Sequence, residues 1–259
     1  MQLKKSLLDS LKIEEIADKD NNNTSLFVFH HLPSDMGVTI GNFLRRIILS
    51  YLEGVAPVGV KITDKNGVAE SKFKSLDGVK EVALYVIMNL KKIILEEKNL
   101  SEGISYLDLK IKNNSNDERL ITAGDFGKNS EIEIKNPDLY LATLAPDCSL
   151  EIRMYYQKNW GYHQVEKQEK LFSDEDNIIV LDTDFSPIKG GKVSFQIKSP
   201  VIGLHEKEEE LYLTITSDGA IKPKEALKKA LELSQDFLTN ITNLISVGSK
   251  KEKKISENK

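Results

Sequence analysis

Residues 37–52 restrict the fold of this chain more than any other stretch. Apolar side chains recur there at i, i+3, i+4, i+7, i+8 and i+11, which is the spacing of one face of an α-helix. They are Ile40, Phe43, Leu44, Ile47, Ile48 and Tyr51. At about 100° per residue, Arg45 and Arg46 flank this face, and Asn42 and Leu49 lie nearly opposite its centre. A helix that only covers a core needs no leucine on its polar side. The pattern therefore predicts a helix that makes contacts on more than one side.

Glycines and polar residues suggest where this helix begins and ends. Gly37 and Thr39, which follow Asp35, suit its N-terminus, and Gly54 suits a C-terminal stop. Gly41 lies inside the helix and would permit close approach of a neighbouring element. An ordinary tolerated glycine, which costs about 1 kcal/mol relative to alanine, is the other interpretation.

A second long amphipathic pattern lies near the end of the chain. Pro223 is a good first-turn residue, and Glu225 suits the positive end of the helix dipole. A seam with steps of four and three residues follows, which is the heptad spacing that lets one helix pack along another. This seam contains Leu227, Leu231, Ser234, Leu238, Ile241 and Ile245. After Val247 almost nothing remains to be buried, so residues 248–259 are predicted to be a disordered linker or tail.

Between these helices the sequence is mainly of β type. Much of 100–160 alternates between apolar and polar residues with a period of two, as in half-buried antiparallel strands. Val79–Leu95 has helical spacing, and 163–176 is predicted to be a loop or short extended piece. We therefore expect an α+β fold of two domains, one of which has an antiparallel sheet with two long helices. The expected domains are residues 1–54 plus 178–247, and an inserted, mostly β domain at 55–177.

Composition excludes several classes of function. The net charge of −4 disfavours general phosphate binding, because nucleic-acid affinity depends on lysine and arginine. The single cysteine, Cys148, can form neither an internal disulfide nor a cysteine metal cluster. No stretch approaches the roughly 18 apolar residues of a membrane span, and acidic residues break any signal-peptide core. These features are typical of a soluble, cytosolic protein.

Asp182-x-Asp184 is the fragment that most resembles part of a metal site. Both carboxylates would face one side of a strand, but no third ligand stands at a recognisable spacing. Two solvated acids at a strand end are therefore the favoured interpretation. The sequence also lacks a Gly-x-Ser-x-Gly nucleophile elbow and a Walker loop. We predict no catalytic, cofactor or metal-binding residue, with a metal-dependent hydrolase that uses Asp182 and Asp184 as an alternative.

Residues 37–50 resemble the signature helix of the alpha-subunit family of bacterial-type RNA polymerases. The pattern is Gly37-x-Thr39-Ile40-Gly41-Asn42-x-Leu44-Arg45-Arg46-Ile47-x-Leu49-Ser50. Further family landmarks follow in family order, across roughly residues 25–245. They are Gly78-Val79-Lys80-Glu81, Met88-Asn89-Leu90-Lys91, Thr122-Ala123-x-Asp125, Gly161-Tyr162, Phe185-Ser186-Pro187 and Gly219-x-Ile221-x-Pro223-x-Glu225-Ala226. Each is weak by itself, but together they are specific.

The resemblance implies a non-catalytic subunit of DNA-directed RNA polymerase. In the family, a domain built from both chain ends forms a homodimer, which is the assembly platform for the large beta and beta-prime subunits. Omega and sigma join them in the complete enzyme. The implied contacts are Asn42, Arg45, Arg46 and Leu49 for beta, and Lys189 and Lys192 for beta-prime. The implied dimer interface comprises Phe43, Leu44, Ile47, Ile48, Leu231, Leu238 and Ile241, of which some could instead fill the core of the domain.

The resemblance also implies a cytoplasmic, nucleoid-associated location. Full-length family members continue through a linker into a small DNA-binding domain, and this chain stops in what resembles that linker. We therefore expect no direct DNA contact from it. The stretches Lys189–Lys192 and Ser199–His205 depart from the family pattern near the implied beta-prime contact. A free-standing homodimeric binding module is a further alternative.

Overall fold

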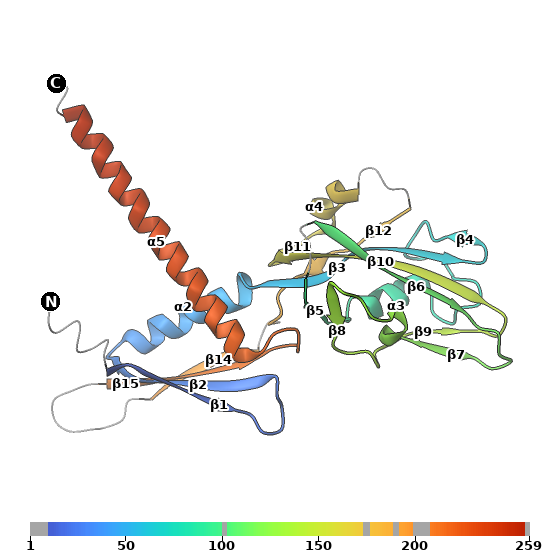
Figure 1. Cartoon of the computed structure of the whole chain (residues 1–259), viewed down its shortest axis with the longest axis horizontal. Helices are drawn as coiled ribbons and strands as arrows, with labels where there is room; N and C mark the ends of the chain where they lie inside the picture. The colour runs from blue at the N-terminus through green and yellow to red at the C-terminus, as the bar shows by residue number, and fades with distance from the viewer. Residues whose placement is uncertain (1–9, 100–102, 173–176, 189–191, 199–207, 257–259) are drawn as a thin grey trace. The chain divides into compact units, whose positions relative to one another are not determined.

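The computed structural model describes residues 10–99, 103–172, 177–188, 192–198 and 208–256. The chain divides into two compact units (Figure 1). Unit 1 comprises Met1–Leu52, Gly190–Thr216 and Lys222–Lys259, and unit 2 comprises Glu53–Lys189 and Ser217–Ile221. Helices and antiparallel sheets occur in both units, so the predicted α+β class is confirmed.

Unit 1 consists of a four-stranded antiparallel sheet and two helices on one of its faces (Figure 1). The strand order is β1-β2-β15-β14. The strands are β1 (Lys12–Ala17), β2 (Thr24–Pro33), β14 (Val193–Lys198) and β15 (Glu208–Thr216). The helices are α2 (Met36–Ser50) and α5 (Pro223–Ser256). Because β15 pairs with β2, segments from both ends of the chain share one sheet.

The core of unit 1 follows the periodicity of its elements. Leu211, Leu213 and Ile215 are buried at every second position of β15, as expected for a strand with one covered face. From α2, Leu44 and Ile48 are buried, four residues apart on one helix face. The first turns of α5 contribute Ala226, Leu227 and Ala230. The rest of α5 runs beyond the sheet, as Figure 1 shows.

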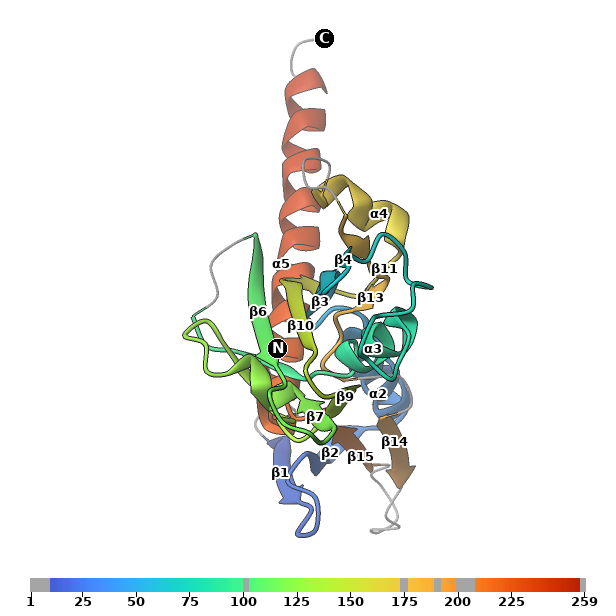
Figure 2. The same cartoon turned by 90° about the vertical axis from the view of Figure 1, so that its right-hand side faces the viewer.

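Unit 2 is built around a seven-stranded sheet with the main order β6-β10-β3-β5-β8. Figure 2 shows β6, β10 and β3 side by side. The strands on this path are β3 (Glu53–Asp64), β5 (Leu95–Glu97), β6 (Ile104–Lys112), β8 (Ile132–Ile134) and β10 (Ser149–Trp160). Two further strands, β4 (Gly67–Val68) and β12 (Ile179–Val180), pair with β3. Helix α3 (Ala83–Leu90) joins the buried cluster of this sheet.

Smaller elements complete unit 2. The pairs β7–β9 and β11–β13 are two-stranded. Their bounds are β7 (Arg119–Thr122), β9 (Tyr140–Leu144), β11 (Tyr162–His163) and β13 (Thr183–Asp184). Helix α4 (Val165–Glu169) and the 3-10 turns η1 (Ala123–Phe126) and η2 (Lys170–Phe172) lie between them in the chain. The prediction of a loop or extended piece at 163–176 was therefore wrong for residues 165–172.

The structure corrects two predicted helix limits. The helical pattern of Val79–Leu95 gives a helix of only eight residues, because Val82 is extended and pairs with Ser75, and Leu95 opens β5. Gly54 is not a helix stop but lies in β3, where a Cβ would meet the carbonyl oxygen of Phe185. Spacing alone does not show that residues at the end of a helical pattern pair with other backbone segments instead of extending the helix.

The structure also differs at the predicted domain limits. Residues 178–188 belong to unit 2, because Ile179 and Val180 of β12 pair with Val60 and Gly59 of β3. At the other end, α5 continues to Ser256, whereas disorder was predicted from residue 248. Lysine and glutamate have high helix propensity, which favours continuation of the helix.

Candidate functional site: the exposed faces of α2 and α5

Helix α5 carries a long apolar face that unit 1 does not cover. Leu238 is 55% exposed, and Phe237, Leu244 and Ile245 are exposed to 58%, 73% and 67%. Leu231, Leu233 and Ile241 are also exposed. Because monomeric proteins rarely expose contiguous apolar surface of this extent, the face indicates a docking surface for another protein.

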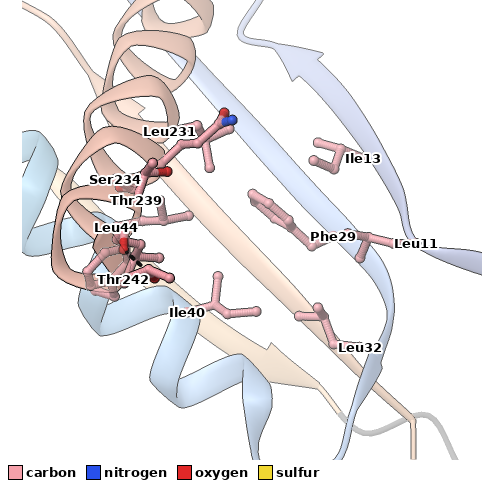
Figure 3. A pocket seen from close by; sticks show the side chains of 13 residues that line it. Leu11, Ile13, Phe29, Leu32, Ile40, Leu44, Leu231, Ser234, Thr239 and Thr242 are labelled. Atoms are coloured by element: carbon pink, nitrogen blue, oxygen red, sulfur yellow. Dashed lines mark hydrogen bonds between the residues drawn. The ribbon is translucent and has the colours of Figure 1, made fainter. Parts of the chain in front are cut away.

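An open groove of about 540 Å³ lies between α5, α2 and the sheet of unit 1 (Figure 3). Phe29 of β2 and Ile40 of α2 point into it. Leu231 and Leu238 of α5 also line it. The remaining lining residues are Leu11, Ile13, Leu32, Phe43, Leu44, Ser234, Gln235, Thr239 and Thr242. The groove and the exposed face of α5 form one surface, which we call the apolar seam.

The implied dimer residues divide into two groups. Phe43, Leu231, Leu238 and Ile241 are exposed in the chain alone, and Ile47 is half-buried. Leu44 and Ile48 are 1% and 0% exposed, so they belong to the core of unit 1, the second possibility that the sequence had left open. A side chain that is already buried gains almost nothing from further burial in a dimer.

The implied contacts with the beta subunit lie on another side of α2. Asn42 and Arg46 are exposed, and Leu49 is half-buried. Their spacing of i, i+4 and i+7 places them on one stripe. In the described part of the chain, the side chains of Asn42 and Arg46 make no hydrogen bond or ion pair with another residue, so they can bind a partner without losing an internal contact.

Arg45 differs from Arg46, although the two are adjacent. Its Nε donates a hydrogen bond of 3.0 Å to the carbonyl oxygen of Val193 on β14. The resemblance had placed both arginines in the contact with beta. The sequence contained no signal for this difference, because Val193 is remote in the chain.

The N-terminus of α2 is capped by a residue that sequence reasoning missed. Asp35 precedes the helix in a left-handed conformation and makes no side-chain cap. The carboxylate of Glu209 on β15 accepts hydrogen bonds from the backbone N–H groups of Asp35 and Gly37, at 2.9 and 3.0 Å. It thus occupies the position where backbone donors and the helix dipole favour a negative charge. No local pattern could reveal a cap that comes from 174 residues away.

Of the two implied beta-prime contacts, the structure describes only Lys192. Lys192 is exposed and precedes β14, and its carbonyl oxygen accepts a hydrogen bond from Thr216 N–H. Lys189 and the stretch 199–205 lie outside the described residues.

The histidines of β2 have acidic partners on β15. His30 Nδ1 lies 2.8 Å from Glu210 Oε1, and His31 Nδ1 lies 2.7 Å from Glu208 Oε2. The hydrogen bond from His30 is the main cause that holds the pKa of Glu210 below its ordinary value. Since these pairs join neighbouring strands of one sheet, they are consistent with a structural role.

The carboxylates at 182 and 184 have separate partners in unit 2. Asp182 Oδ1 lies 2.7 Å from Lys91 Nζ, and its Oδ2 accepts a hydrogen bond from Tyr162. The hydrogen bond from Lys91 holds the pKa of Asp182 below its ordinary value. Asp184 accepts the backbone N–H of Ser186 within a turn. Among the residues that the structure describes, no group of three histidine, cysteine or acidic side chains could hold a metal ion.

Comparison with known proteins tests the resemblance to the alpha-subunit family. A family model described as "RNA polymerase Rpb3/RpoA insert domain" matches residues 60–186. The DNA-directed RNA polymerase subunit alpha of Borreliella afzelii (strain PKo) is 32% identical over 255 residues, covering 95% of this chain and 72% of the relative. The chain belongs to the alpha-subunit family of DNA-directed RNA polymerases.

Other members give the same result. The subunit alpha of Thermus thermophilus is 35% identical over 217 residues, covering 84% of this chain and 65% of the relative. That of Pyropia yezoensis is 30% identical over 250 residues, covering 95% of this chain and 76% of the relative. The chain thus spans 65–76% of the length of the relatives named here.

Membership confirms the main functional prediction. The chain is a non-catalytic alpha subunit of a nucleotidyltransferase complex in which other subunits carry catalysis. The likenesses support neither a metal-dependent hydrolase nor a free-standing binding module. In the described part of the chain, every helix is too short or too polar to cross a membrane.

Proposed function

We propose that this chain forms a homodimer through the apolar seam of unit 1. The observation that carries the proposal is the exposed face of α5 beside an open groove lined by Phe29, Ile40 and Phe43. In a two-fold dimer the same patch is used twice, so each groove and each α5 face becomes covered by the partner. Leu231, Leu238 and Ile241 supply the α5 side of this interface.

The dimer is a platform for the two large polymerase subunits. The stripe of Asn42, Arg46 and Leu49 contacts the beta subunit, with Arg46 as its charged centre. Arginine suits this role because its planar guanidinium donates five hydrogen bonds in a fixed geometry. Phe43 and Leu231 line the groove, whereas this stripe lies on another side of α2. One helix can therefore serve the dimer and the large subunit at once.

Lys189 and Lys192 contact the beta-prime subunit. Because a symmetric dimer offers each patch twice, beta binds the stripe of one copy, and beta-prime binds mainly the other copy. Omega and sigma complete the enzyme, which works at the nucleoid in the cytoplasm. Unit 1 carries the dimer contacts, and the two-unit organisation is that of a two-ended assembly domain with an inserted β domain.

The test combines molar mass in solution with recovery of the large subunits. Wild type, Arg46→Ala, Leu238→Glu and Asn243→Glu chains are expressed beside the beta and beta-prime subunits of the same cell. Asn243→Glu is the matched control, because it adds the same charge to an exposed position on α5 about 140° away from Leu238. Light scattering gives the mass of each chain alone.

We expect wild type and Asn243→Glu to be dimers that recover both large subunits. Leu238→Glu should be a folded monomer, because it places two charges in an apolar interface. Arg46→Ala should remain a dimer and lose beta. A folded wild-type monomer that recovers no large subunit would refute the proposal.

A further inference from the structure

One side of α2 lies directly on β14. Three residues on this side are spaced by four: Gly37, Gly41 and Arg45. A Cβ on Gly41 would lie 2.7 Å from Cδ2 of Phe195, and a Cβ on Gly37 would lie 3.3 Å from Cγ1 of Ile197. The helix backbone thus approaches the strand as closely as glycine allows.

The positions along helix and strand match. Gly37, Gly41 and Arg45 meet Ile197, Phe195 and Val193 in order, so four helix residues correspond to two strand residues. Four residues of α-helix advance by about 6 Å, and two residues of antiparallel strand advance by about 6.8 Å. Since these rises are nearly equal, the contact can repeat along the whole length of β14.

Polar contacts fix both ends of the contact between α2 and β14. At the N-terminal end, the carboxylate of Glu209 accepts a hydrogen bond from the N–H of Gly37. A Cβ on Gly37 would lie 2.9 Å from Oε2 of Glu209. At the other end, Arg45 Nε donates to the carbonyl oxygen of Val193. The helix can neither slide along the strand nor turn about its axis without losing these bonds.

We infer that Gly37, Gly41 and Arg45 form a register seam between α2 and β14, in which Arg45 is a positioning residue. The seam sets the rotation of α2 about its axis. That rotation decides where Asn42, Arg46 and Leu49 point. Arg45 therefore acts on assembly through Val193 rather than by touching the large subunit. This inference rests on the proposed function of the stripe, and it assigns the adjacent arginines to different tasks.

Two variants of Arg45 separate positioning from direct contact. Gln Nε2 is separated from Cα by the same number of bonds as Arg Nε, so Arg45→Gln keeps a donor for Val193 while it removes the charge. Arg45→Lys keeps the charge but has no donor at that position. The dissociation constant of each purified dimer for the beta subunit is measured beside Arg45→Ala, with Arg46→Gln and Arg46→Lys as matched controls.

If the register seam positions the stripe of α2, Arg45→Gln should bind beta within about twofold of wild type. Arg45→Lys and Arg45→Ala should bind beta about tenfold more weakly than wild type. Arg46→Gln should lose binding, because the positive charge of Arg46 makes the contact with beta. The reverse order at position 45, with lysine tolerated and glutamine not, would overturn the inference and leave the proposed function intact.

Hydrogen exchange of the dimer alone tests the register seam without the large subunit. Amides of α2 and β14 should exchange at wild-type rates in Arg45→Gln and faster in Arg45→Lys. Gly41→Ala should also speed exchange, and adding Phe195→Leu should partly restore protection by making room for the methyl group. Equal exchange in all of these variants would overturn the seam. Failure of wild type to bind beta would instead refute the proposed function.

Discussion

Truncation of Leu238 to alanine gives a quantitative test of the dimer interface. The change removes three carbons, which correspond to about 2.4 kcal/mol of apolar transfer free energy at about 0.8 kcal/mol each. Because Leu238 is 55% exposed in the chain alone, about 1.3 kcal/mol of this remains to be gained on association. A two-fold interface contains the residue twice, so the free energy of dimerisation should fall by roughly 2.6 kcal/mol.

This loss raises the dimer dissociation constant roughly 80-fold. Sedimentation equilibrium over a dilution series measures the constant, and circular dichroism confirms that the fold is kept. Asn243→Ala is the control, because Asn243 is exposed on another side of α5. If Leu238→Ala changed the constant less than about fivefold, the assignment of this α5 face to the interface would be wrong.

Three further predictions concern stability. Glu209→Ala should lower the free energy of unfolding by about 1–2 kcal/mol in urea denaturation, because it removes the cap of α2, and an unchanged value would contradict the capping role. Ile48→Ala should lower it by about 2–5 kcal/mol through a cavity in the core of unit 1, and a loss below about 1 kcal/mol would place this side chain outside the core. Asp182 has a folded pKa below its ordinary value, chiefly through Lys91, so its ion pair stabilises the fold above the unfolded pKa and is lost as pH falls through the folded pKa. Asp182→Asn should therefore flatten the decline of stability below about pH 4, and parallel pH profiles for variant and wild type would contradict this.

The sequence predicted those features of the site that depend on local periodicity. The apolar spacing from Ile40 to Tyr51 predicted α2, and the heptad steps after Pro223 predicted α5. The common side of Asn42, Arg46 and Leu49 could be derived because the three residues belong to the same helix. A helix has a fixed angle per residue, so its faces can be derived without knowledge of its neighbours.

Contacts between distant segments could not be derived in this way. The hydrogen bonds of Glu209 and Arg45 join residues that are 174 and 148 positions apart, and no spacing rule relates them. Helical periodicity alone places both arginines beside the apolar face. The fold makes them different, since one of them reaches a carbonyl oxygen of β14.

Burial separated the apolar residues in the same manner. The sequence by itself determined that Leu44, Ile48, Leu231 and Leu238 lie on apolar helix faces. Only the tertiary structure decided that the first two fill the core of unit 1, whereas the last two remain exposed beside the groove. The physical reason is that hydrophobicity drives a side chain out of water without specifying which surface covers it, and that choice depends on where the sheet and the other helix lie.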